Sequence, residues 1–230
     1  MAFAIGSDWP GRINSIGASD TYLPLGASLK STHPPPSTKP ISMSEIVYFI
    51  TGASRGIGLE FINQLVKREK SIVYAGVRNP ASLENHFRSP RPDNLHIVQC
   101  DVTSDESVEG AATIVSEKSG KVDVLINNAG IDNGLSIRET SVDSLRMVLE
   151  TNVVGVHRMI RAFLPLISAS SIKKIINISS DFGSIALNDR NFAGAYNTSK
   201  AALNMLTVQY KNEFAEEGII FIPLHPGDVR

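Results

Sequence analysis

The sequence predicts an α/β fold, in which helices cover both faces of a doubly wound parallel sheet. Short apolar runs rich in β-branched residues alternate with amphipathic segments, which is the pattern of successive βαβ units. The first apolar run leads directly into a glycine-rich turn, and no sequence period repeats along the chain. At 230 residues the chain has the length of one domain with a full hydrophobic core.

The first predicted strand, residues 45–50, leads into a turn with the spacing G-x-x-x-G-x-G, and an amphipathic helix follows. In this context the glycines indicate a phosphate site. Gly52 permits the tight turn, and Gly56 lets the backbone approach a pyrophosphate, while Gly58 allows the helix to pack closely on the strand. The helix N-terminus adds unpaired N–H groups. A glycine-rich loop without a ligand is the alternative.

The second predicted strand, residues 71–77, ends at Arg78, where nucleotide-binding folds read the ribose. An acidic residue here is typical of NAD, whereas a nearby arginine accommodates the 2′-phosphate of NADP. Arg55, inside the glycine turn, is a candidate second clamp because a guanidinium fits phosphate geometry. Two solvated loop arginines are the alternative, and the sequence favours NADP(H).

Polar residues also follow the third and fourth predicted strands, residues 95–100 and 122–126. A carboxylate at a strand's C-terminal end lies on the ligand edge of such a sheet, where Asp101 can reach an adenine ring. Asp101 can equally cap the next helix, because residues 103–106 resemble a capping box. The amides of Asn127–Gly130 would support the backbone beside the nucleotide, unless the segment is a plain turn.

Two more strands are predicted at residues 174–178 and 219–224, and a helix between them runs from Ala195 to Phe214. Tyr196 and Lys200 lie four residues apart in this helix and therefore share a face. A cation beside a phenol lowers the phenol's pKa from about 10 toward neutrality, which makes Tyr196 a candidate general acid or base. Most such pairs are ordinary helix surface, so other motifs decide the case.

Taken in order, the motifs resemble the short-chain dehydrogenase/reductase family over roughly residues 45–230. The resemblance rests on Thr51–Gly58, Asp101, Asn127–Gly130, Asn152, Ser179-Ser180, Tyr196-x-x-x-Lys200 and Pro226-Gly227. The chain looks most like members with a long loop between Ser180 and Tyr196, such as C-factor-like proteins, sniffer-like carbonyl reductases and fungal ketoreductases. The resemblance implies a Rossmann-like fold and an NADPH-dependent reduction of a ketone or aldehyde to an alcohol.

Carried onto this sequence, the resemblance implies a catalytic tetrad. Tyr196 would exchange a proton with the substrate oxygen as hydride leaves or reaches the nicotinamide, and Lys200 would lower the tyrosine's pKa and bind the nicotinamide ribose. Ser180 would polarise the substrate oxygen. Asn152, in a helix that begins near Val142, would tie Lys200 to a chain of waters, or would merely satisfy backbone groups of an irregular helix. Two serines compete with Ser180 and are disfavoured: Ser179 and Ser184.

The resemblance also implies a set of cofactor-binding residues and no metal ion. This set is Gly52, Ser54, Arg55, Gly56, Ile57, Gly58, Arg78, Asp101, Val102, Asn128, Ala129, Gly130, Tyr196, Lys200, Pro226, Gly227 and Val229.

Composition argues against several other classes. Lys and Arg number 22 against 23 Asp and Glu, without the basic stripe of a nucleic-acid-binding protein. No apolar run approaches the ~18 residues of a membrane span. Cys100 is the only cysteine, which excludes an intramolecular disulfide and fits a reducing compartment. We therefore expect a cytoplasmic protein acting on a small-molecule carbonyl or alcohol, and the resemblance adds a homodimer or homotetramer.

The two ends of the chain depart from the family pattern. Residues 1–44 are rich in Ser, Gly and Pro and are predicted to form a disordered extension, with an alternative start at Met43. After Arg230 the family's usual last strand and substrate lid are missing, so residues 45–230 are expected to form an incomplete domain. A truncated NADP(H)-binding or partner-binding protein without catalysis is therefore the alternative function, and NAD-dependent oxidation is a third.

Overall fold

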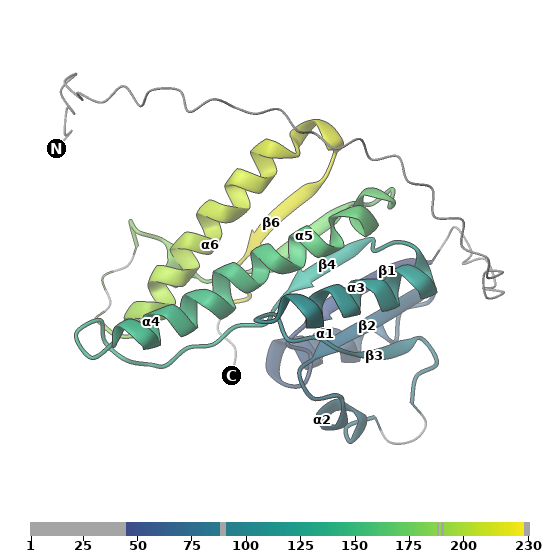
Figure 1. Ribbon diagram of the computed structural model, residues 1–230, viewed down its shortest axis with the longest axis horizontal. Coiled ribbons are helices and arrows are strands. Elements are labelled where there is room, and N and C mark those ends of the chain that lie inside the picture. The colour runs from purple at the N-terminus through teal and green to yellow at the C-terminus, as the bar shows by residue number, and fades with distance from the viewer. Residues whose placement is uncertain (1–44, 88–90, 188, 190, 228–230) are drawn as a thin grey trace, which may run out of the picture. The chain divides into compact units, whose positions relative to one another are not determined.

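The computed structural model describes residues 45–87, 91–187, 189 and 191–227. The predicted disordered extension at residues 1–44 and the predicted cofactor residue Val229 both lie outside the described residues. The strands are β1 Ile46–Thr51, β2 Ser71–Val77, β3 Leu95–Gln99, β4 Val124–Asn127, β5 Lys174–Ile178 and β6 Ile220–Leu224. They form one parallel sheet in the order β3-β2-β1-β4-β5-β6, which confirms the predicted fold class (Figure 1).

Helices connect successive strands. The helices are α1 Gly56–Leu65, α2 Pro80–Glu84, α3 Asp105–Ser119, α4 Val142–Leu149, α5 Gly155–Ser168 and α6 Gly194–Glu213. A π-helical turn, η1 Glu150–Val154, joins α4 to α5, and two 3₁₀ turns are η2 Asp181–Gly183 and η3 Ala215–Glu217. In the part of the chain that the structure describes, no helix combines the length and apolarity needed to cross a membrane.

The sheet is buried on both faces, and β1 shows how. Val47 and Phe49 pack into a cluster that includes residues of α3, α5 and α6, whereas Tyr48 and Ile50 pack into a second cluster beside α1 and α2. Alternate side chains point to opposite faces, so a strand covered on both faces reads as a continuous apolar run. Figure 1 looks onto the face that α3 and α5 cover, with α1 behind the sheet.

The largest cluster also holds the single cysteine. Cys100 is 3 % exposed, and its Sγ lies 3.6 Å from Sδ of Met159 on α5. Burial raises the pKa of the Cys100 thiol to about 12, and the charge of Asp101 adds to the shift. The thiol therefore behaves as a small apolar group in the core.

The strand order reverses beside β1, which pairs with β2 on one side and β4 on the other. In an open parallel sheet, ligands bind beyond the carboxyl ends of the strands at such a reversal. At the other end of the described sheet β6 pairs with β5, and our expectation of a missing further strand stays a prediction.

A buried carboxylate holds several elements together where the amino ends of the strands lie, opposite the carboxyl edge. Asp123, just before β4, is fully buried. Its Oδ2 accepts hydrogen bonds from the backbone N–H of Val47 at 2.8 Å and from Nζ of Lys121 at 2.7 Å. Its Oδ1 accepts one from the Ser170 hydroxyl at 2.5 Å. One side chain thus joins β1, the start of β4 and the end of α5.

We expect Asp123→Ala to lower the free energy of unfolding by about 3–5 kcal/mol, because it leaves a buried N–H, a hydroxyl and an ammonium without their acceptor. Urea denaturation of the two proteins measures the change. The matched control is Asp143→Ala, which breaks an exposed ion pair with Arg146 and should have little effect. Equal losses in both variants would contradict this role for Asp123.

Candidate active site

The glycine turn after β1 is shaped by close backbone contacts. Gly52 has a φ of +64°, and a Cβ at this position would lie 2.8 Å from Cα of Ala129. A Cβ at Gly58 would lie 2.6 Å from Nδ2 of Asn128. A side chain larger than that of glycine would therefore clash at both positions. With glycine there, the loop after β4 can lie directly against the turn.

The N-terminus of α1 is open toward the same edge. Gly56 is its first residue, and no atom lies within 4 Å of the place a Cβ would take. The preceding Arg55 provides no side-chain cap, whereas α3 and α4 are capped by Ser104 and Ser141. The first N–H groups of α1 are thus left for another acceptor. This turn fits the pyrophosphate of a dinucleotide.

Asn128 fastens the end of β4 to the glycine turn. Its Nδ2 donates hydrogen bonds to the carbonyl oxygens of Thr51 at 3.0 Å and Gly52 at 3.1 Å. In return, the Thr51 hydroxyl accepts the N–H groups of Asn128 and Ala129, both at 3.0 Å. The predicted support of the turn by this segment therefore has a geometric basis. Thr51 carries half of it, a part that the sequence analysis did not assign.

Charged side chains lie in the glycine turn and just after β2 and β3. Arg55 and Arg78 are both exposed, and Arg78 comes directly after β2. Burial alone would raise the pKa of Asp101, but hydrogen bonds from the N–H and hydroxyl of Thr103 and the charges of Arg78 and Arg158 lower it overall. Asp101 therefore presents a carboxylate near Arg78.

The alternative role of Asp101 as a helix cap is wrong. Helix α3 begins at Asp105, and its cap is Ser104, whose hydroxyl accepts the N–H of Ser107 at 3.2 Å. Asp101 instead accepts the N–H of Thr103, two residues on. The other predicted cofactor residues follow β1, β3 and β4 at the same edge: Ser54, Ile57, Val102, Ala129 and Gly130.

Asn152 lies in the middle of the π-helical turn η1 and is 1 % exposed. Its Oδ1 accepts the N–H of Ile131 at 2.8 Å, and its Nδ2 donates to the carbonyl of Ile131 at 2.9 Å and to the Ser199 hydroxyl at 2.9 Å. The amide thus holds the backbone that follows Gly130, across the site, rather than backbone groups of its own helix. Its link to Lys200 through waters stays a prediction.

Ser199 is a second polar residue that sequence analysis missed. It is fully buried, and its hydroxyl donates to the carbonyl of Tyr196 at 2.7 Å while accepting from Asn152. The signal was a polar residue on the inward face of the helix, between the two residues of the Tyr-Lys pair.

Lys200 is 5 % exposed, and its Nζ donates to the carbonyl of Ile178, at the end of β5, at 2.7 Å. Burial lowers the pKa of the Lys200 ammonium to about 8. The nitrogen lies 5.2 Å from the centroid of the Tyr196 ring and 3.8 Å from the place a Cβ of Gly130 would take. The structure thus brings Lys200, Tyr196 and Gly130 together.

The pKa of Tyr196 shifts in the direction opposite to the expected one. Burial raises it, a hydrogen bond with Ser180 lowers it, and the carboxylates of Asp132 and Asp181 raise it again, with a net increase. Lys200 is not among the causes of this shift. The sequence spacing correctly placed the two groups together, but it did not reveal how strongly the phenol is desolvated.

Of the three serines, Ser180 is the one that bonds Tyr196. Its Oγ also accepts the N–H of Phe182 at 3.2 Å. The Ser179 hydroxyl donates to Oδ1 of Asn204 on α6 at 2.6 Å, so neighbouring serines point in different directions. The preference for Ser180 over Ser179 therefore agrees with the geometry.

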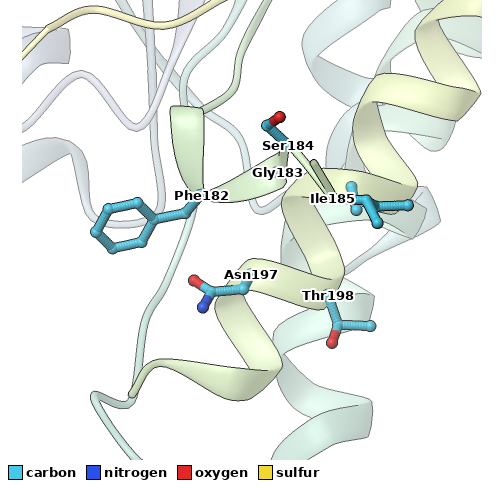
Figure 2. Close-up of a pocket in the computed structure, with 7 residues that line it drawn as sticks. Phe182, Gly183, Ser184, Ile185, Asn197 and Thr198 are labelled. Atoms are coloured by element: carbon cyan, nitrogen blue, oxygen red, sulfur yellow. The ribbon is translucent and has the colours of Figure 1, made fainter. Parts of the chain in front are cut away.

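The third serine, Ser184, lines a hollow of about 400 Å³ beside the first turns of α6 (Figure 2). Its walls are Phe182, Gly183, Ser184, Ile185, Asn197, Thr198 and Ala201. The Phe182 ring stands nearly perpendicular to the Tyr196 ring, with centroids 6.2 Å apart. The hollow therefore adjoins Tyr196.

Pro226 and Gly227 follow β6 at the same edge and are exposed, and Gly227 has a φ of +82°. With them, predicted residues follow every strand of the sheet. The described members of the predicted site thus converge on its carboxyl edge.

Comparison with known proteins shows the family of this chain. The short chain dehydrogenase family model matches residues 46–230. An uncharacterised oxidoreductase of Schizosaccharomyces pombe is 38 % identical over 192 residues, which are 83 % of this chain and 76 % of that protein.

Two solved structures share the fold. The NADPH-bound carbonyl reductase from chicken fatty liver has a TM-score of 0.74 at 34 % identity, covering 80 % of each chain. The carbonyl reductase Sniffer of D. melanogaster has a TM-score of 0.73 at 28 % identity, covering 80 % of this chain and 81 % of that one. Family model, relatives and structures agree, and the chain belongs to the short-chain dehydrogenase/reductase family of oxidoreductases.

Proposed function

We propose that this chain is an NADPH-dependent reductase that converts a ketone or aldehyde to an alcohol, with Tyr196 as general acid. The observation that carries the proposal is the meeting of Ser180, Tyr196 and Lys200 at the carboxyl edge of the sheet. Bound NADPH would supply the hydride. The open N-terminus of α1 would take its pyrophosphate.

A proton donor must carry its proton at the working pH, and Tyr196 meets this condition. A phenol whose pKa lies above its ordinary value is protonated at neutral pH, so Tyr196 holds the proton that the reduced oxygen needs. Ser180, which bonds the tyrosine, would hold the carbonyl oxygen beside it. Lys200, whose Nζ lies 5.2 Å from the centroid of the Tyr196 ring, would bind the nicotinamide ribose.

The choice of NADPH over NADH rests on Arg78 and Arg55. Both are exposed beside the edge that would hold the ribose, and the residue after β2 is an arginine where an acid would favour NAD. The similar chicken carbonyl reductase is NADPH-bound in its crystal structure, which supports the same choice here.

A small-molecule substrate, a cytoplasmic location and a homodimer or homotetramer complete the proposal. Exposed apolar side chains on α4, η1 and α6 support the assembly: Met147, Val154, Met205 and Val208.

We expect Tyr196→Phe to lower kcat for reduction by roughly 10²–10⁴-fold, because the general acid is lost while the ring remains. NADPH oxidation is followed with a panel of aromatic ketones, quinones and aldehydes. The dissociation constant for NADPH, measured by fluorescence, should change little. Tyr48→Phe is the control for loss of a phenol elsewhere. Tight NADPH binding by the wild type without turnover on any substrate would favour the binding-only alternative.

We expect Arg78→Asp to weaken NADPH binding by roughly 10- to 100-fold and NADH binding far less, because only NADPH carries the 2′-phosphate. Dissociation constants for both cofactors measure the effect. Arg68→Asp, an exposed arginine beyond the end of α1, is the charge-matched control. An equal loss for the two cofactors would remove Arg78 as the 2′-phosphate clamp.

We expect the free energy of unfolding to depend on pH because of Lys200. Its pKa is about 8 in the folded protein against an ordinary 10.5, so between these values the unfolded chain binds more protons. The free energy of unfolding of the wild type should therefore rise with pH across this window by roughly 3 kcal/mol relative to Lys200→Met. Below about pH 8 the full cost of the buried charge is present, and above about pH 10.5 it is gone.

Urea denaturation at several pH values across the window measures this difference. The control is Lys118→Met, which removes an exposed lysine but keeps Lys200, so its free energy of unfolding should rise with pH in parallel with that of the wild type. Parallel curves for the wild type and Lys200→Met would contradict the lowered pKa.

A further inference from the structure

Arg158 on α5 donates hydrogen bonds to three other segments of the chain. Its Nη1 donates to the carbonyl of Val102 at 2.5 Å, its Nη2 donates to Oε1 of Glu150 at 3.0 Å, and its Nε donates to Oδ1 of Asp105. These acceptors belong to the loop after β3, the first residue of the π-helical turn and the first residue of α3. The Arg158 side chain is only 16 % exposed.

A guanidinium suits this junction because its N–H groups point in fixed directions within one plane. The two carboxylates pair with its charge and hold the plane in one orientation, and the third nitrogen donates to the backbone carbonyl of Val102. An amine on a flexible stem would reach one of the three acceptors as a point charge, but it would not hold all three in register.

The loop that Arg158 holds is the proposed adenine end of the cofactor site. Val102 is buried and follows Asp101 at the carboxyl end of β3. Helix α5 also supports Val102 through Gly155, where a Cβ would lie 3.0 Å from the Val102 carbonyl oxygen. Gly155 and Arg158, one turn apart on α5, thus both hold this loop against the helix.

The other end of the junction leads toward the proposed catalytic groups. Glu150 opens the π-helical turn whose central residue is Asn152. Asn152 in turn holds the backbone of Ile131 through both atoms of its amide. The ion pair between Glu150 and Arg158 therefore connects the turn that carries Asn152 with the loop that carries Val102.

We propose that Arg158 is a positioning residue, aimed by Asp105 and Glu150, that holds the Asp101-Val102 loop in place for the adenine ring of the cofactor. The inference rests on the proposed function, because it assumes that this edge binds an adenine nucleotide. It adds a residue on a helix behind the site, which touches neither cofactor nor substrate.

The test uses 2′,5′-ADP, the adenine half of NADPH, as the probe. By isothermal titration calorimetry, Arg158→Gln should weaken its binding about tenfold, as expected for loss of one charge-assisted hydrogen bond that orders the loop. The KM for NADPH should rise by a similar factor while kcat at saturating NADPH changes little. Arg158→Lys, which keeps the charge without the planar fork, should recover part of the affinity.

Two further variants guard against a folding defect. Asp105→Asn keeps the size of an exposed side chain and removes one aiming carboxylate, so it should weaken 2′,5′-ADP in the same direction but less. Arg146→Gln breaks an exposed ion pair with Asp143 on α4 and should leave the affinity unchanged. Thermal unfolding of each variant shows how much of any effect is a general loss of stability.

The outcomes separate this inference from the proposed function. If the wild type does not bind 2′,5′-ADP, the proposed function fails and the inference falls with it. If the wild type binds the probe and Arg158→Gln binds it equally well, with or without a lower melting temperature, the inference alone is wrong. A lower kcat with unchanged probe affinity and KM would also overturn it.

Discussion

Because the six strands of the described sheet run in one direction, the segments that follow them must meet at the carboxyl edge of the sheet. The topology alone brings the predicted site residues together there, from Gly52 after β1 to Gly227 after β6. The hydrogen bonds between strands, however, do not hold the loops that extend beyond the strand ends. Side-chain amides hold these loops by hydrogen bonds. Asn128 joins the loop after β4 to the glycine turn, and Asn152 joins the same loop to η1. Further in, Asn127 donates to Asn177, which donates to Thr207 on α6. The order of the site therefore depends on amides that can donate and accept at once.

The electrostatics of the site follow from burial as much as from charge. Lys200 is held by the carbonyl of Ile178, and removal from water makes its ammonium easier to deprotonate. Tyr196 loses water as well, and two carboxylates lie close enough to oppose its ionisation. Desolvation thus acts in opposite directions on the two pKa values, bringing that of the cation down and that of the phenol up. In the proposed reduction, a pair arranged this way would keep its proton on the tyrosine until a developing negative charge on the substrate oxygen draws it away.

The sequence was sufficient for what is local or periodic. The strands β2 and β5 were predicted to the residue, and the glycine turn, the Tyr196–Lys200 pair and the preference for Ser180 follow from spacing and alternation. What it missed depends on contacts between distant segments. No local sequence pattern indicates the π-helical turn at Asn152. The hydrogen bonds of Arg158 are likewise not visible in the local sequence, because their acceptors lie in other elements. The direction of the Tyr196 pKa shift was wrong because burial cannot be read from an i, i+4 pair. Asp101 was ambiguous, since a carboxylate before a capping box fits two roles.

One buried group has a practical consequence. Cys100 is the chain's single thiol, and it is packed against Met159 with almost none of its thiolate form present at neutral pH. The thiolate is the form that attacks an alkylating reagent, so the folded wild type has almost no group with which such a reagent can react. A cysteine introduced at any exposed position would then be the one reactive thiol. A fluorophore or spin label could be attached there selectively, without first replacing the natural residue and disturbing the core around it.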